Sequence, residues 1–160
     1  MDRLDSLDPR NDYEGRRWPN NIEAIQSFLN FYEDIDFEDL NAVTGSPDQS
    51  RLTFSNLSLS IRPEILLSGN LMRYGDVVGA VKLYFTKDEE LFLTPQSGQY
   101  PTSLIYQFLS EHQQRRPLPR LCFIIDVFGQ TVHTAPRSYR RLLNEVSAAC
   151  EEIGLRWSQV

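Results

Sequence analysis

The residue pair with the clearest chemical potential in this chain is Glu64 with Lys82. Lys82 is one of two lysines beside fourteen arginines, and it lies inside the apolar run of residues 77–85. Glu64 lies in an alternating stretch, residues 58–67, and a turn at residues 73–76 would join the two stretches as a hairpin. Such a turn pairs positions whose numbers sum to about 146, which sets Glu64 opposite Lys82. The simplest prediction is a cross-strand ion pair.

Strand alternation adds two polar side chains to the same surface. Arg62 shares a face with Glu64, and Tyr84 shares a face with Lys82. Arg62 could contact a phosphate, although pairing with Glu64 is the simpler prediction. Tyr84 could stack on a nucleic-acid base, but packing at a sheet edge or under a helix is commoner for such an aromatic, and the same holds for Tyr106.

Two short motifs resemble those of the PD-(D/E)XK nuclease superfamily, especially its RecB-like and phage-exonuclease-like branches. They are Pro63-Glu64 in one expected strand and Ala80-Val81-Lys82 in the next. The expected order α-β-β-β-α-β, over residues 20–135, is also similar. The resemblance implies that a carboxylate after proline and an acid two places before the lysine bind Mg²⁺ or Mn²⁺. It also implies that the lysine positions the attacking water, so Glu64 and Lys82 would be catalytic.

The chain departs from this motif at two positions. Glu64 replaces the usual aspartate, and Ala80 stands at the second acid position without a ligand atom. Since protein sites usually hold Mg²⁺ through one or two carboxylates, losing one should weaken the site. A displaced acid could replace it, and the candidates are Asp126, Glu33, Glu23 and Asp76. We select Asp126 as the second metal ligand beside Glu64; the resemblance further implies a role for Gln107 in the helix after the third strand.

Net charge bears on the class of partner. The total is -6, distributed as -7 over residues 1–60, -1 over 61–109 and +2 over 110–160. The overall sign opposes general binding to phosphate backbones. A local basic surface could still form in the last third, and clustered arginines suit phosphate or carboxylate. Its candidate residues are Arg115, Arg116, Arg120, Arg137, Arg140 and Arg141. The alternative is a set of solvated helix and loop faces.

Three functional readings follow. We predict a PD-(D/E)XK-like domain with an incomplete metal site that acts by binding nucleic acid or protein. If it is an enzyme, we expect a nuclease dependent on Mg²⁺ or Mn²⁺. The alternative is a small acidic interaction or inhibitor protein that masks a basic partner through the acidic run at residues 33–39.

Other classes of site have little support. His112 and His133 are not at ligand spacing, and Cys122 and Cys150 lack a second pair for zinc. We expect both cysteines to be buried free thiols in a reducing cytoplasm. The chain has no apolar run of about 18 residues, which predicts no membrane span.

The elements that must position these residues suggest one α/β domain. The 160 residues are 41% apolar and 24% charged, as in ordinary globular domains. We expect a polar arm at residues 1–19 and a domain at 20–160, with a mixed sheet of about five strands flanked by helices in the order α-β-β-β-α-β-β-α.

The hydrophobic patterns give approximate boundaries. Asn20 should cap a first helix with an apolar stripe at Ile22, Ile25, Leu29 and Tyr32, ending at the acidic run. A second helix is expected at 101–112. A third is expected at 136–153, with Leu142, Val146, Ala149 and Ile153 buried and Gly154 after its end. Beyond the hairpin, strands are expected at 51–57, 121–127 and 131–134, with a linker at 114–119.

Overall fold

The computed structural model describes residues 12–35, 37, 39–46 and 51–157, so residues 1–11 of the expected arm lie outside it. The helices and strands are α2 (Asp12–Leu29), β1 (Asn41–Thr44), β2 (Arg51–Phe54), β3 (Leu57–Ser60), β4 (Ile65–Leu71), β5 (Gly75–Tyr84), α3 (Gln99–His112), β6 (Arg116–Asp126), β7 (Thr131–Thr134) and α4 (Tyr139–Trp157). Two short 3₁₀ turns, η1 (Tyr32–Asp34) and η2 (Glu89–Leu91), complete the described elements. None of the described helices combines the length and apolarity that crossing a bilayer requires.

Five strands form one mixed sheet in the order β1-β4-β5-β6-β7. β5 and β6 are parallel, and the other neighbours are antiparallel. A parallel pair needs a long crossover, which α3 supplies between β5 and β6. β2 and β3 form a separate hairpin. The predicted single α/β domain with a mixed sheet flanked by helices is confirmed.

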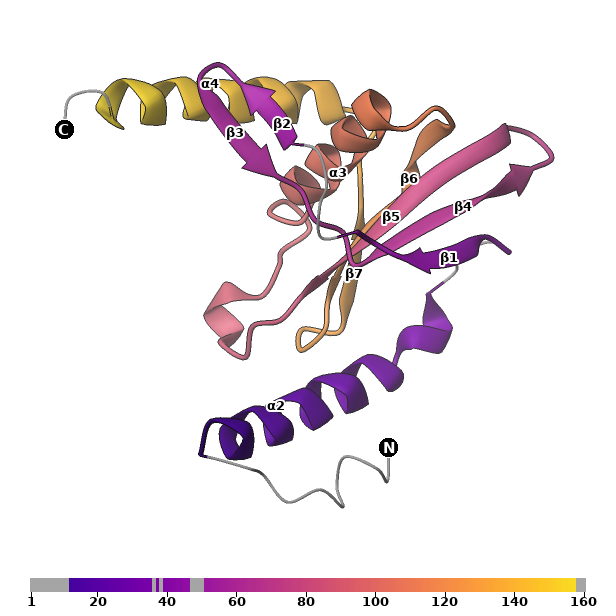
Figure 1. The fold of residues 1–160 in the computed structure, drawn as a ribbon, viewed down its shortest axis with the longest axis vertical. Helices are drawn as coiled ribbons and strands as arrows, with labels where there is room; N and C mark the ends of the chain where they lie inside the picture. The colour runs from indigo at the N-terminus through magenta and orange to yellow at the C-terminus, as the bar shows by residue number, and fades with distance from the viewer. Residues whose placement is uncertain (1–11, 36, 38, 47–50, 158–160) are drawn as a thin grey trace.

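The sheet lies between two layers of other elements. Figure 1 shows α2 on one side and α3, α4 and the β2–β3 hairpin on the other. Alternation along β5 divides the core accordingly: Val77 and Val81 join the apolar cluster that includes Phe28 of α2, while Val78 and Ala80 join the cluster that includes α3. β6 is buried from Leu121 onward, as predicted for a central strand.

The first helix differs from its predicted form. α2 begins at Asp12 and contains Pro19, so Asn20 is not its cap. Instead, Asn20 and Glu23 both accept hydrogen bonds from Lys87 in the β5–α3 connection. The expected apolar stripe faces the core only in part, because Ile22 is half-buried whereas Tyr32 is exposed.

The face of α2 that reaches the core carries other residues. Ser27 Oγ donates to the Val127 carbonyl at 2.8 Å, and Phe28 packs against the core, whereas Ile25 and Leu29 are 40% and 46% exposed. The helix does end before the acidic run, as predicted.

Two strand predictions need correction. The expected strand at 58–67 is interrupted around the buried Pro63, and β1 was not predicted. The expected linker at 114–119 includes the first part of β6, where the pairing with β5 shifts register between Val78 and Ala80. Gly79 lies at this shift, and a Cβ there would overlap Leu121, so the close approach requires glycine.

The last helix also differs from its predicted form. α4 runs from Tyr139 through Gly154 to Trp157. Its buried residues are Leu142 and Cys150, with Val146 half-buried between them, whereas Ala149 and Ile153 are exposed. The contact stripe therefore follows i, i+4 and i+8, which is one ridge of a helix packed against α3.

Candidate functional site

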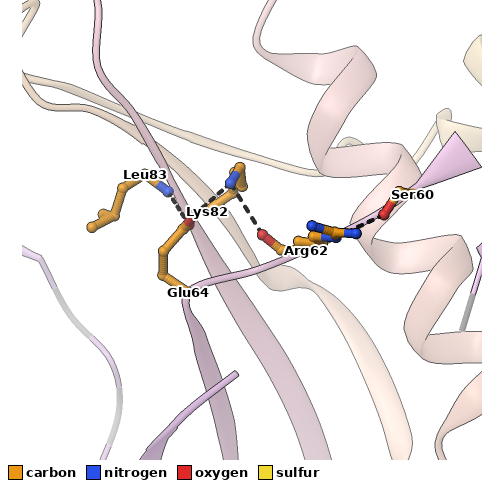
Figure 2. Close-up of polar contacts among 5 residues, drawn as sticks. All are labelled: Ser60, Arg62, Glu64, Lys82 and Leu83. Atoms are coloured by element: carbon orange, nitrogen blue, oxygen red, sulfur yellow. Dashed lines mark hydrogen bonds and ion pairs between the residues drawn. The ribbon is translucent and has the colours of Figure 1, made fainter. Parts of the chain in front are cut away.

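The predicted hairpin register is confirmed, and it brings Glu64 to Lys82. Ile65 pairs with Val81 and Leu66 with Ala80, so paired positions sum to 146. Just before β4 the backbone alignment shifts by one residue, because Glu64 N–H donates to the Val81 carbonyl at 2.9 Å. The side chains meet with Lys82 Nζ 2.5 Å from Glu64 Oε1 (Figure 2).

Further hydrogen bonds hold this pair in place. Leu83 N–H donates to Glu64 Oε2 at 2.7 Å, so both carboxylate oxygens have N–H partners. Lys82 Nζ also donates to the Arg62 carbonyl at 3.1 Å. The bond from Leu83 was not foreseen, because a backbone donor leaves no signature in residue type.

The break at Pro63 explains why Glu64 reaches this position. Proline has no N–H to donate to the hydrogen bonds between strands. Pro63 lies in the short segment that separates β3 from β4. Glu64 then rejoins the sheet between β1 and β5, since Gly45 N–H donates to its carbonyl at 2.8 Å. A short irregular segment thus delivers the carboxylate to the end of β5.

Ala80 lies on the same face of β5 as Lys82, two residues away. Its side chain is fully buried among apolar residues that include Ile105 and Phe108 of α3. The position at which the family motif places its second acid therefore carries a methyl group in the apolar core.

Asp126 lies at the same end of the sheet, one strand further along. It is aligned with Tyr84 in the parallel β5–β6 pair, and alternation puts it on the α3 face with Lys82. The carboxyl group is fully buried and accepts N–H bonds from Leu93 at 2.8 Å and Gly129 at 3.0 Å. Asp126 thus secures the β5–α3 connection and the β6–β7 turn.

The structure does not gather the proposed ligands into a metal cluster. Across the described ranges, no group of three or more His, Cys, Asp or Glu side chains is arranged to hold a metal ion. The alternative acids have other partners: Glu23 binds Lys87, Glu33 accepts from Tyr32, and Asp76 accepts from Asn70. The pairing of Glu64 with Asp126 as metal ligands stays a prediction.

The other candidate side chains make local contacts. Arg62 Nε donates to Ser60 Oγ at 3.0 Å, so its predicted pairing with Glu64 is wrong. Because the chain breaks at Pro63, Arg62 points back toward β3, as Figure 2 shows. Tyr84 donates its hydroxyl to the Leu91 carbonyl, and Gln107 donates to Glu111.

The two candidate arginines at the start of α4 differ from each other. Arg141 forms an ion pair with Glu145 at 2.7 Å, while Arg140 is exposed.

Tyr106 packs with its ring centroid 4.4 Å from that of Tyr139, which confirms its predicted packing role. Of the acidic run, Glu33 and Asp39 are exposed, and Asp36 and Glu38 lie outside the described residues.

The thiols and histidines add no reactive group to this site. Cys122 and Cys150 are free and buried, as predicted. Burial raises the pKa of the Cys122 thiol, which stays protonated at neutral pH. Burial also lowers the pKa of His133, with Asp126 acting in the opposite direction.

Comparison of the chain with protein-family models, curated proteins and solved structures gave no match.

Proposed function

We propose that this chain is a PD-(D/E)XK-like protein with an incomplete metal site, and that it acts by binding nucleic acid instead of cutting it. The observation that carries the proposal is the Glu64–Lys82 pair on neighbouring strands, together with the buried Ala80 two residues before the lysine. An acid and a lysine meet where the family motif has them, and the second acid is missing.

The order of elements supports this proposal. When the β2–β3 hairpin is set aside as an insertion, α2, β1, β4, β5, α3 and β6 follow the order α-β-β-β-α-β. Lys82 and Asp126 share one face near the ends of the adjacent strands β5 and β6, and Glu64 reaches Lys82 from the segment before β4. That is the placement a phosphate-handling site on this sheet would need.

The same geometry argues against cutting. Metal-assisted phosphodiester hydrolysis depends on carboxylates that converge on the metal. Glu64 is neutralised by Lys82 and bonded to Leu83 N–H, and Asp126 is engaged by two backbone donors. A Mg²⁺ or Mn²⁺ ion would have to displace these bonds before either carboxylate could coordinate it.

Several cationic and polar groups are the proposed contacts to nucleic acid. Lys82 is 38% exposed and Arg62 is exposed beside it. Tyr84, Gln107, Arg140 and Arg141 are weaker candidates because three of them already have protein partners. We place the protein in the cytoplasm, where unpaired thiols such as Cys122 and Cys150 stay reduced.

Fluorescence anisotropy with labelled single-stranded and duplex oligonucleotides, in EDTA, tests this proposal. We expect an affinity that falls with salt and is lowered in Lys82→Ala, and no cleavage when Mg²⁺ or Mn²⁺ is added. Cleavage that requires Glu64 and Lys82 would contradict the proposal and indicate a working nuclease. Absence of binding, with retention of a basic protein that depends on Asp34, Asp36 and Asp39, would favour the acidic interaction protein.

A further inference from the structure

Three arginines converge on one aromatic ring at the turn between β4 and β5. Tyr74 is half-buried in this turn and packs against the cluster on the α2 side of the sheet. The guanidinium carbons of Arg73, Arg116 and Arg120 lie 5.7, 5.8 and 5.0 Å from its ring centroid. All three arginines are exposed. We call these four residues the Tyr74 surface.

The parallel pairing of β5 with β6 creates this surface. Val77 is aligned with Arg116, so the start of β6 lies beside the β4–β5 turn although some forty residues separate them in sequence. Lys82 lies at the other end of β5, about 23 Å from the turn at about 3.3 Å per residue. The Tyr74 surface is therefore distinct from the Glu64–Lys82 site.

The charges of Arg73 and Arg116 are poorly compensated. Within the described residues, neither Arg73 nor Arg116 has an ion pair. The acid of the same hairpin, Asp76, instead accepts a hydrogen bond from Asn70 at 2.8 Å. A chain of net charge -6 thus keeps two arginines without an acidic partner among the described residues at this exposed position.

We propose that the Tyr74 surface binds the phosphate backbone of a nucleic acid; this inference rests on the proposed function, in which nucleic acid is the partner. A guanidinium over a ring face is held by the cation–π interaction, while its N–H edge stays free for a phosphate oxygen.

Met72 favours nucleic acid over an acidic peptide as the occupant. Its side chain is fully exposed at the tip of the same turn, next to Arg73. Proteins that bind the minor groove of a duplex frequently combine arginine or lysine contacts with an apolar side chain, methionine among them, inserted between base steps. An acidic peptide would leave Met72 in water.

The test is anisotropy with a labelled duplex in EDTA, comparing wild type with Arg73→Ala/Arg116→Ala. Loss of two phosphate contacts should weaken binding roughly 30-fold at 0.15 M salt and reduce the slope of log affinity against log salt by about 2. Arg140→Ala/Arg141→Ala removes the same charge from α4 and should weaken binding less. Arg73→Lys/Arg116→Lys keeps both charges but loses the planar guanidinium that donates two hydrogen bonds to one phosphate. Its affinity should lie between those of wild type and the alanine pair.

The outcomes separate this inference from the proposed function. Wild-type binding that is unchanged in Arg73→Ala/Arg116→Ala, or weakened equally by both alanine pairs, overturns the Tyr74 surface and leaves the proposed function standing. A wild-type protein that binds no nucleic acid overturns both. Competition by polyglutamate as effective as that by unlabelled duplex overturns the choice of nucleic acid as the occupant. Thermal unfolding of each variant shows that the exposed substitutions leave the fold intact.

Discussion

Glu64 Oε1 lies 2.5 Å from Lys82 Nζ, and this contact joins the segment before β4 to the end of β5. The other oxygen of the same carboxylate accepts the Leu83 N–H, so one acid satisfies a side chain and a backbone donor together. Glu64 and Lys82 are 37% and 38% exposed, which leaves the pair open to solvent screening. The pair therefore joins the segment before β4 to β5 while Lys82 stays accessible to a ligand.

The two members of the pair should differ in their contribution to stability. Lys82→Ala removes a screened ion pair and should lower the free energy of unfolding by less than about 1 kcal/mol. Glu64→Ala also leaves the half-buried Leu83 N–H without its acceptor and should cost about 1–2 kcal/mol. Glu64→Gln is the matched control, because it keeps an oxygen for Leu83. Urea unfolding measures all three, and a larger loss for Lys82→Ala than for Glu64→Ala would contradict this account.

Restoring the missing acid should create a metal dependence. Ala80→Asp places a carboxylate diagonal to Glu64 across β4 and β5, about 7–8 Å away between Cα atoms. In EDTA the buried charge should cost about 3–5 kcal/mol. We expect Mn²⁺ to raise the melting temperature of this variant and to have no such effect on Ala80→Asp/Glu64→Ala.

The exposed Ala42 of β1 supplies the control for that experiment. Ala42→Asp adds the same charge at the surface and should change stability by less than about 0.5 kcal/mol, with no response to Mn²⁺. If Ala80→Asp were equally insensitive to Mn²⁺, the proposed relation of the Glu64–Lys82 site to a metal site would be refuted.

His133 should make the fold less stable in mild acid. Its pKa is lowered by burial, so the unfolded chain binds more protons than the folded one below about pH 6.5. Stability is therefore complete above about pH 6.5 and declines as the pH falls toward the lowered pKa. Urea midpoints from about pH 7.5 to about pH 5.5 should fall more in wild type than in His133→Gln. Parallel curves for the two proteins would exclude this role for His133.

The hairpin that carries the candidate pair was predictable from sequence for a physical reason. Alternating polarity on both strands and a turn at residues 73–76 together specify which residues face each other. The observed sum of 146 for paired positions confirms that register. Glu64 and Lys82 could thus be brought together without a structure.

Other features depended on packing that residue types do not encode. β1 consists of four exposed residues without an alternating pattern, so nothing marked it as a strand. The direction of Arg62 follows from the break at Pro63, and α2 continues back to Asp12 through the expected capping position at Asn20. Arg73 and Arg116 come together only through the parallel pairing of β5 and β6.

The most direct test of the central claim is a thermal-shift titration with Mn²⁺ and Mg²⁺ on wild type and Glu64→Ala. A metal at 100 times its dissociation constant would stabilise the fold by about 2.7 kcal/mol, a readily measured shift. The account of an incomplete metal site predicts no saturable shift at millimolar metal in either protein. A saturable shift in wild type that is absent in Glu64→Ala would contradict it and show that a functional metal site is present.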